Sequence, residues 1–285
     1  MNILSLQSWV AYGHVGNAAA VFPLQRLGAE VWAINTVQFS NHPGYGSWTG
    51  HVATGEMVAD LVAGIAARGV LGTCDAVLSG YMGDKTVGKA ILGAVRTVRS
   101  ANPAALYCCD PVMGDAGQLY VRPGIPELIA EHAVPASDLL TPNQFELERL
   151  TGCPCADVEG VRRAVAQLRA RMAQSGPRAI LVTSLRTNET PADALDMVAA
   201  DAHGCTLLRS PLLPIAPSGA GDATAALFLY HFLTTKRADA AMAAAASAIH
   251  GVLRRTYAAN SREMLLIAAQ DEIVRPSRRF ATRIF

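Results

Sequence analysis

Charged residues are scarce in this sequence and nearly balanced in sign. They make up 16% of the 285 residues, with 24 Lys and Arg against 23 Asp and Glu, for a formal net charge of +1. This balance excludes the strongly basic surface that attracts nucleic acid. Long apolar runs are also lacking, because none approaches the roughly 20 residues that cross a bilayer. The Ala-rich stretch from 238 to 249 is short and contains Asp239. We therefore expect a globular protein with neither nucleic acid nor a membrane as partner.

The opening segment, Met1 to Ser8, has no basic leader and no apolar region of secretory length, so we expect a cytoplasmic protein. Six cysteines are present, and two of them, Cys108 and Cys109, fall in an apolar run typical of a buried strand. Cys153-Pro154-Cys155 is the only candidate metal pair. It lacks a second Cys or His pair at zinc-site spacing, so we expect reduced thiols and no zinc there.

No linker, repeat or low-complexity tract divides the chain, and apolar runs alternate with helical patterns along it. Continuous apolar strands between helices indicate a parallel sheet covered on both faces. We predict one α/β domain spanning residues 1–285. The expected strands are 2–6, 30–35, 76–79, 105–110, 138–141 and 179–183, and the expected helices are 16–27, 54–68, 84–100, 125–133, 143–150 and 158–174. A hairpin of 194–200 with 205–209 follows, and the chain from 221 onward is mainly helical.

Polar residues follow these strands where each one ends. They are Ser8, Asn35-Thr36, Gly80-Tyr81, Asp110, Thr141-Pro142-Asn143 and Thr183-Ser184. In open α/β sheets ligands bind at the carboxyl ends of the strands. Six polar strand ends on one edge therefore predict a binding site there.

The most informative segment is Pro217-Ser218-Gly219-Ala220-Gly221-Asp222-Ala223-Thr224, which precedes an apolar helical stretch. Small residues at a helix start leave backbone N–H groups free to bind an anion such as phosphate. Asp222 lies among these donors, where it can remove a proton from an attacking nucleophile. Taken alone, the segment favours an ordinary turn in which Asp222 only caps the helix.

Five motifs together resemble pyridoxal kinases of the ribokinase-like superfamily, in order and spacing over nearly the whole chain. They are Asn35-Thr36-Val37-Gln38-Phe39-Ser40-Asn41-His42, Leu78-Ser79-Gly80-Tyr81-Met82-Gly83, Asp110-Pro111-Val112-Met113-Gly114-Asp115, Thr141-Pro142-Asn143-Gln144-Phe145-Glu146-Leu147-Glu148 and Gly219-Ala220-Gly221-Asp222. The last two mark the superfamily, whereas the first is typical of the vitamin B6 branch. The resemblance implies a three-layer α/β/α fold and ATP-dependent phosphorylation of the 5′-hydroxymethyl group of pyridoxal, in vitamin B6 salvage.

The resemblance also implies roles for individual residues. Asp222 is the expected base, and the backbone N–H groups of Gly219, Ala220 and Gly221 are expected to stabilise the transferring phosphoryl group. The expected pyridine pocket consists of Ser8, Val37, Phe39, Pro43, Gly44 and Tyr81. Val37 and Phe39 alternate as core residues also do, so a purely structural role is the competing interpretation.

On the nucleotide side, the resemblance implies that ATP is bound by Asp110, Thr141, Asn143, Glu146, Thr183, Ser184, Ser210, Pro211, Leu212 and Leu213. Mg²⁺ and a monovalent cation such as K⁺ are expected near Asp110, Asp115, Thr141, Glu146 and Thr183. The competing interpretation is that Glu146 only caps its helix. Residues 114–122 are the expected mobile flap over ATP. A homodimer is also implied, with 16–27 and 47–50 as the candidate interface.

Three positions depart from the family pattern. Pro43 replaces a Thr and offers neither hydroxyl nor backbone N–H. Thr183 stands where the nearest bacterial relatives have Lys, and 213–218 is a few residues shorter. Two alternatives therefore remain: a hydroxymethylpyrimidine kinase of thiamin synthesis, and a B6-binding protein with little turnover.

Overall fold

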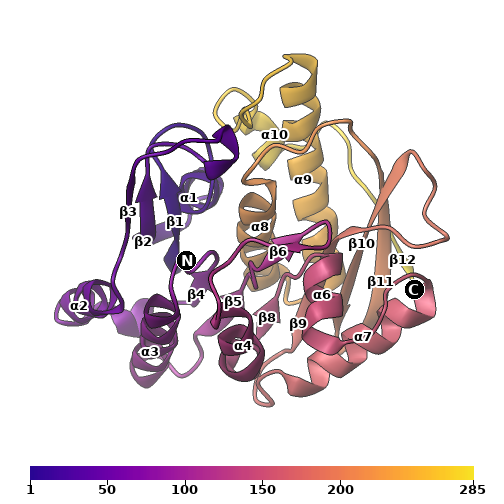
Figure 1. Ribbon diagram of the computed structural model, residues 1–285. Coiled ribbons are helices and arrows are strands. Elements are labelled where there is room, and N and C mark those ends of the chain that lie inside the picture. The colour runs from indigo at the N-terminus through magenta and orange to yellow at the C-terminus, as the bar shows by residue number, and fades with distance from the viewer.

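A ten-stranded sheet forms the centre of the computed structural model, which describes residues 1–285 (Figure 1). Its order is β12-β11-β10-β9-β8-β5-β4-β1-β2-β3. The six strands from β9 to β2 in this order are parallel, and the remaining pairs are antiparallel. The strands are β1 (Asn2–Val10), β2 (Glu30–Phe39), β3 (Gly50–Val52), β4 (Ala76–Ser79), β5 (Leu106–Cys109), β8 (Leu139–Leu140), β9 (Ala179–Leu185), β10 (Ala194–Asp201), β11 (Gly204–Pro211) and β12 (Thr282–Ile284).

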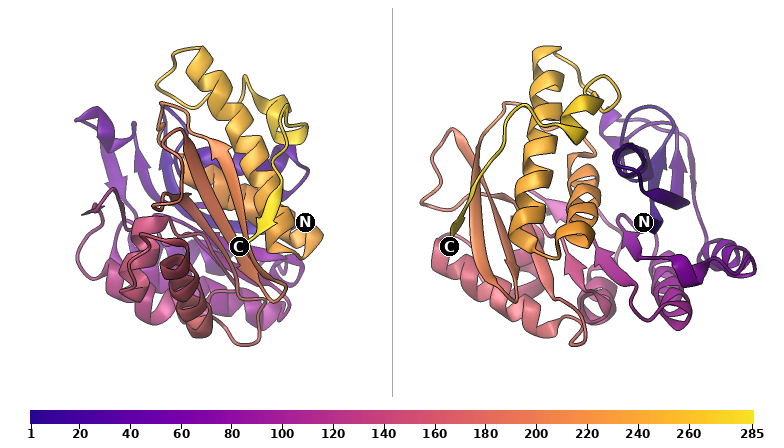
Figure 2. Two further views of the ribbon diagram at one scale, coloured as in Figure 1. Left: turned by 90° about the vertical axis from the view of Figure 1, so that its right-hand side faces the viewer. Right: turned by 180° about the vertical axis from the view of Figure 1, so that it is seen from behind.

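Helices cover both faces of this sheet, as the views in Figure 2 also show. On one face lie α1 (Asn17–Arg26), α8 (Ala220–Thr235), α9 (Ala238–Ala258) and α10 (Gln270–Val274). On the other lie α2 (Gly55–Ala66), α3 (Lys85–Ala101), α4 (Ile125–Leu128), α6 (Gln144–Thr151) and α7 (Val158–Arg171). A π-helical turn (Ile129–Ala133) joins α4 to α5 (Val134–Ala136), and short 3-10 turns occupy Pro43–Tyr45 and Leu71–Thr73. Two buried apolar clusters, of 40 and 33 residues, fill the two interfaces between helices and sheet. The predicted three-layer α/β/α arrangement is confirmed.

Local chemistry explains where several of these helices begin. The side chains of Thr54, Asp84, Asn143 and Asp157 each accept a hydrogen bond from a backbone N–H in the first turn of the helix that follows. Such caps satisfy donors that have no partner within the helix. These starts lie within one or two residues of the sequence prediction. The predicted hairpin is also present, as β10 and β11.

The structure extends or adds strands that the sequence pattern did not indicate. β1 and β2 continue to Val10 and Phe39, beyond the predicted ends. β3 pairs with the added part of β2, and β12 pairs with β11 near the C-terminus. Both are three-residue edge strands, too short to produce an alternating pattern. The C-terminal tail is therefore partly a sheet strand, although its arginines remain exposed.

None of the helices combines the length and apolarity that spanning a membrane would need.

Candidate active site

The carboxyl ends of the parallel strands meet at one edge of the sheet and bring the predicted site residues together. Asp110 follows β5, and Thr141 follows β8. Because β10 is antiparallel to both β9 and β11, β11 runs in the same direction as β9 and ends at the same edge. The segment Ser210–Leu213 therefore reaches this edge as well. Ser8 lies within β1, at a register shift between Gln7 and Trp9 relative to β2.

Asp222 lies in the first turn of α8, where a loop far away in sequence holds its carboxylate. The backbone N–H of Gly16 donates to Asp222 Oδ2 at 2.9 Å. Gly16 has φ +59°, and a Cβ there would overlap the carbonyl and hydroxyl oxygens of Ser8. Burial raises the pKa of Asp222 to about 6, although the bond from Gly16 opposes this shift. A carboxylate with a pKa near neutrality is suited to accept a proton.

Gly219 and Gly221 precede Asp222, and the structure gives a different reason for a glycine at each position. Gly219, with φ +89°, approaches the carbonyl of His14 so closely that a Cβ would overlap it. The missing side chain of Gly219 therefore permits close contact with the protein's own backbone. By contrast, a Cβ on Gly221 would have no atom within 4 Å. Open space therefore borders α8 at Gly221, and Ala220 is the first residue of the helix.

Asp110 is a buried carboxylate near the half-buried Asp222. Only 7% of its surface is exposed, and Thr141 Oγ1 donates to its Oδ1 at 2.9 Å. Burial, reinforced by the negative charge of Asp222, raises the pKa of Asp110 to about 8. Two neighbouring carboxylates repel one another, and a bound cation relieves that repulsion. The chain has no cluster of three or more Asp, Glu, His or Cys able to hold a metal by itself.

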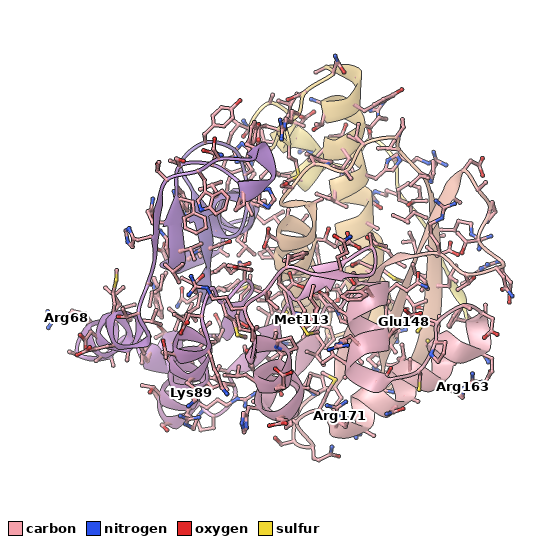
Figure 3. The ribbon with its side chains drawn as sticks, viewed as in Figure 1. Arg68, Lys89, Met113, Glu148, Arg163 and Arg171 are labelled. Carbon is pink, nitrogen blue, oxygen red and sulfur yellow. The ribbon has the colours of Figure 1, made fainter.

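Glu146 is almost fully buried, and backbone amides occupy both oxygens of its carboxylate. Oε1 accepts from the N–H of Met113 and Oε2 from that of Asn143, each at 2.9 Å. Asn143 completes a capping box by accepting from the N–H of Glu146, and its Nδ2 donates to the carbonyl of Gly114 at 2.8 Å. Met113 lies near the middle of the molecule, whereas Arg68, Lys89 and Arg163 lie at its periphery (Figure 3). Glu146 thus takes part in capping its helix, as the competing interpretation expected. Glu146 and Asn143 together hold the backbone of the segment that follows Asp110.

The predicted flap contains a small hairpin of β6 (Gly114–Asp115) and β7 (Gln118–Leu119). Its turn uses Ala116 and Gly117 at φ +48° and +82°, and Asp115 Oδ1 accepts from the N–H of Ala116. Tyr120 follows the hairpin with 55% of its surface exposed. Its pKa is raised by desolvation of the hydroxyl and by the negative charges of Glu146, Asp110 and Asp222. The hydroxyl of Tyr120 therefore lies near the acidic groups of the site.

The expected pyridine pocket combines β2 with two loops. Val37 is buried, and Phe39 lies 6.1 Å from Trp48 between ring centroids. The carbonyl of Tyr81 accepts from Thr36 Oγ1 at 2.6 Å. Burial raises the pKa of the Tyr81 phenol.

Pro43 and Gly44 form the short 3-10 turn after β2. His42 Nδ1 accepts from the N–H of Gly44 at 3.1 Å and lies 3.1 Å from Ser218 Oγ. His42 thus connects this turn to the segment that carries Asp222.

The residues expected to contact the nucleotide beyond β8 are held in place mainly by hydrogen bonds to backbone atoms. Thr183 N–H donates to the carbonyl of Pro142 at 2.9 Å, and Ser184 adopts a left-handed conformation, φ +52°, at a bulge of β9. Ser210 Oγ is 3.4 Å from the carbonyl of Leu195, and Leu212 N–H donates to that of Asp193. Pro211 and Leu212 are exposed, and Leu213 is half-buried.

Sequence reasoning missed Gly16 as a site residue. Its only signal was its place as the first residue of the helix predicted over 16–27, whereas its contact with Asp222 spans 206 positions.

Comparison with known proteins identifies close relatives. A family model described as phosphomethylpyrimidine kinase matches residues 54–265. The chain is 59% identical to "Pyridoxal kinase PdxY" of Granulibacter bethesdensis over 285 residues, covering 100% of both chains. It is 53% identical to the protein of the same name from Rubrobacter xylanophilus, covering 99% of this chain and 97% of that one. Among solved structures, pyridoxal kinase from Leishmania donovani in complex with ADP and pyridoxamine has a TM-score of 0.89, with 28% identity, and the match covers 99% of this chain and 98% of that one.

Proposed function

This chain belongs to the pyridoxal kinase family, and we propose that it transfers the γ-phosphoryl group of ATP to the 5′-hydroxymethyl oxygen of pyridoxal. Pyridoxine and pyridoxamine are proposed as further acceptors, and the product of the main reaction is pyridoxal 5′-phosphate. The observation that carries the proposal is the placement of Asp222, half-buried with its pKa raised to about 6, at the start of α8. Relatives named pyridoxal kinase over the full length support it.

In the proposed reaction Asp222 accepts the proton of the 5′-hydroxymethyl group as its oxygen attacks the γ-phosphorus. The bond from the γ-phosphorus to the bridging oxygen breaks, and ADP leaves. The backbone N–H groups of Gly219, Ala220 and Gly221 lie at the start of α8, where they stabilise negative charge on the transferring group. Gly16 holds the carboxylate of Asp222 in place during this step. Positioning and electrostatics are the main contributions that a protein makes to phosphoryl transfer.

Asp110, with Thr141 beside it, fits a Mg²⁺ ion that arrives with ATP. The raised pKa of Asp110 reflects repulsion from Asp222 as well as burial, and a cation between ATP and these carboxylates offsets both. The ion supplies charge neutralisation for the phosphate oxygens. We propose that Glu146 and Asn143 act through the segment after Asp110, whose backbone they hold. Roles for Asp115 and Thr183 in metal or K⁺ binding stay predictions.

For the two substrates, we propose that ATP lies over Thr183, Ser184 and the end of β11, beneath the β6–β7 hairpin. The pyridine ring then lies opposite, among the residues predicted for that pocket. These are Ser8, Val37, Phe39, Pro43, Gly44 and Tyr81. Residues 1–285 are proposed to form one cytoplasmic kinase domain that assembles as a homodimer, which light scattering of the purified protein tests. Exposed Trp48 lies in the predicted interface.

Competing acceptors provide the direct test of function. The match to a model described as phosphomethylpyrimidine kinase favours hydroxymethylpyrimidine as the second candidate substrate. ATP-dependent product formation is to be measured with pyridoxal, pyridoxine, pyridoxamine and hydroxymethylpyrimidine, with and without K⁺. We expect the highest kcat/KM for a B6 vitamer. Preference for the pyrimidine contradicts the proposal, and saturable pyridoxal binding without product identifies a binding protein instead.

A further inference from the structure

The 3-10 turn at Pro43–Tyr45 lies in the loop His42–Gly46. Few hydrogen bonds within this loop stabilise its conformation. Gly44 and Gly46 are exposed, and Gly46 has φ +89°. Within the loop the hydrogen bonds join His42 to Gly44 and Tyr45 and join Pro43 to Gly46. Pro43 has no N–H to add another. A loop of this composition needs outside support if it is to present a fixed surface to a substrate.

That support comes from the segment just after α9. Arg262 Nη2 donates to the carbonyl of Gly44 at 2.8 Å, and Arg262 Cζ lies 3.6 Å from the centroid of the Tyr45 ring. The Tyr45 hydroxyl donates to Glu263 Oε1 at 2.6 Å. Two adjacent side chains thus make three contacts with two adjacent loop residues. Hydrogen bonds to charged groups and a cation over an aromatic ring are among the stronger polar contacts.

The supporting segment is itself well anchored. Ser261 Oγ donates to the carbonyl of Glu263 at 2.7 Å, and the neighbouring Met264 is fully buried. The other carboxylate oxygen of Glu263 lies against Gly13, where a Cβ would overlap it. Gly13 belongs to the same loop as Gly16. Glu263 therefore connects the His42–Gly46 loop to the loop that holds Asp222.

We propose that Arg262 and Glu263 are positioning residues that fix the His42–Gly46 loop and thereby set the affinity of the enzyme for its alcohol substrate. The inference rests on the proposed role of Pro43 and Gly44 in binding that substrate. Neither side chain takes part in proton or phosphoryl transfer. Loss of either one releases the loop, and the substrate then has to order it on binding.

Steady-state kinetics of Arg262→Ala and Glu263→Ala test the proposal. We expect KM for pyridoxal to rise about tenfold in each, the factor that losing one hydrogen bond to a charged group produces. For Arg262→Ala, which leaves the Glu263–Gly13 contact in place, we expect kcat and KM for ATP to stay within about twofold of wild type. Glu263→Gln keeps an acceptor for the Tyr45 hydroxyl and is expected to restore KM for pyridoxal. Arg254→Ala, which removes an exposed arginine paired with Glu272, is the matched control and leaves all three constants unchanged.

A second measurement, hydrogen exchange of the amides of residues 44–46 in ligand-free protein, does not depend on activity. We expect exchange to be about tenfold faster in Arg262→Ala and unchanged in Arg254→Ala. The proposal is overturned if both the exchange rate and KM for pyridoxal are unchanged in Arg262→Ala. It is also overturned if the variant has a lowered Tm and if kcat falls and the KM values for pyridoxal and ATP rise by the same factor. If wild-type protein prefers the pyrimidine, the proposed function fails. The same exchange experiment, with KM for that alcohol, still decides whether the loop is positioned in this way.

Discussion

The backbone N–H of Gly16 donates to Asp222 Oδ2 at 2.9 Å and so joins the two ends of the site across 206 positions of sequence. Gly16 can do this because its positive φ and missing Cβ let the backbone lie directly against Ser8. Gly16 thus contacts both Asp222, the proposed base, and Ser8, the first residue of the expected pyridine pocket.

Asp222→Asn should remove the proton acceptor and leave the shape of the site intact, because Asn still accepts from Gly16. We expect kcat to fall by roughly 10²- to 10⁴-fold, with KM for pyridoxal and ATP changed only a few-fold. Initial rates at saturating substrate measure the loss. Asp60→Asn, at an exposed position of α2, is the control. Near-normal turnover of Asp222→Asn contradicts the assignment of the base.

The activity of wild-type enzyme should depend on the protonation of Asp222. Its pKa is raised from 3.8 to about 6, and only the deprotonated form accepts a proton. We therefore expect kcat/KM for pyridoxal to rise about tenfold per pH unit below pH 6 and to level off above it. A profile from pH 5 to 8 measures this. A flat profile through pH 6 argues against Asp222 as the titrating group.

Gly16→Ala should disturb both stability and catalysis. The new Cβ overlaps Ser8 and the residue keeps φ +59°, so we expect a loss of about 2–4 kcal/mol in the free energy of unfolding. We also expect a fall in kcat, because the N–H that holds Asp222 shifts. Gly28→Ala is the matched control, with φ +91° but no atom within 4 Å of the new Cβ. Backbone strain alone, about 1 kcal/mol, is expected there, with normal kcat. Equal effects of the two substitutions would refute the overlap argument.

Asp110→Asn should stabilise the ligand-free protein increasingly as pH rises from 5 to 8. Because the pKa of Asp110 is raised from 3.8 to about 8, the folded state binds its proton more tightly than the unfolded state. The resulting stability is present below pH 4 and is lost as pH rises toward 8. Asn carries no charge, so Tm of the variant should exceed that of wild type increasingly from pH 5 to 8. A gain of about 1 kcal/mol corresponds to roughly 2–4 °C.

Thermal melts with and without Mg·ATP complete this experiment. Wild type should gain more from the nucleotide than Asp110→Asn does, because the added cation offsets the charge of Asp110 only where that charge exists. A variant with a lower Tm at every pH would show that the charged carboxylate stabilises the fold.

Much of this architecture could be predicted from short-range patterns. Apolar runs marked the parallel strands, because a strand buried on both faces must be apolar throughout. Capping residues such as Asp84 and Asn143 marked helix starts to within one or two residues. β3 and β12 were missed, since pairing at a sheet edge depends on a partner strand elsewhere in the chain.

The sequence by itself determined the α/β alternation, the polar strand ends and the Gly219-Ala220-Gly221-Asp222 turn, because each depends on residues a few positions apart. Only the tertiary structure decided that Gly16 holds Asp222, that the charge of Asp222 acts on Asp110, and that Arg262 and Glu263 hold the His42–Gly46 loop. Those relationships join segments separated by one hundred to more than two hundred residues. Their geometry is set by how the layers pack, and no local pattern of residue types encodes it.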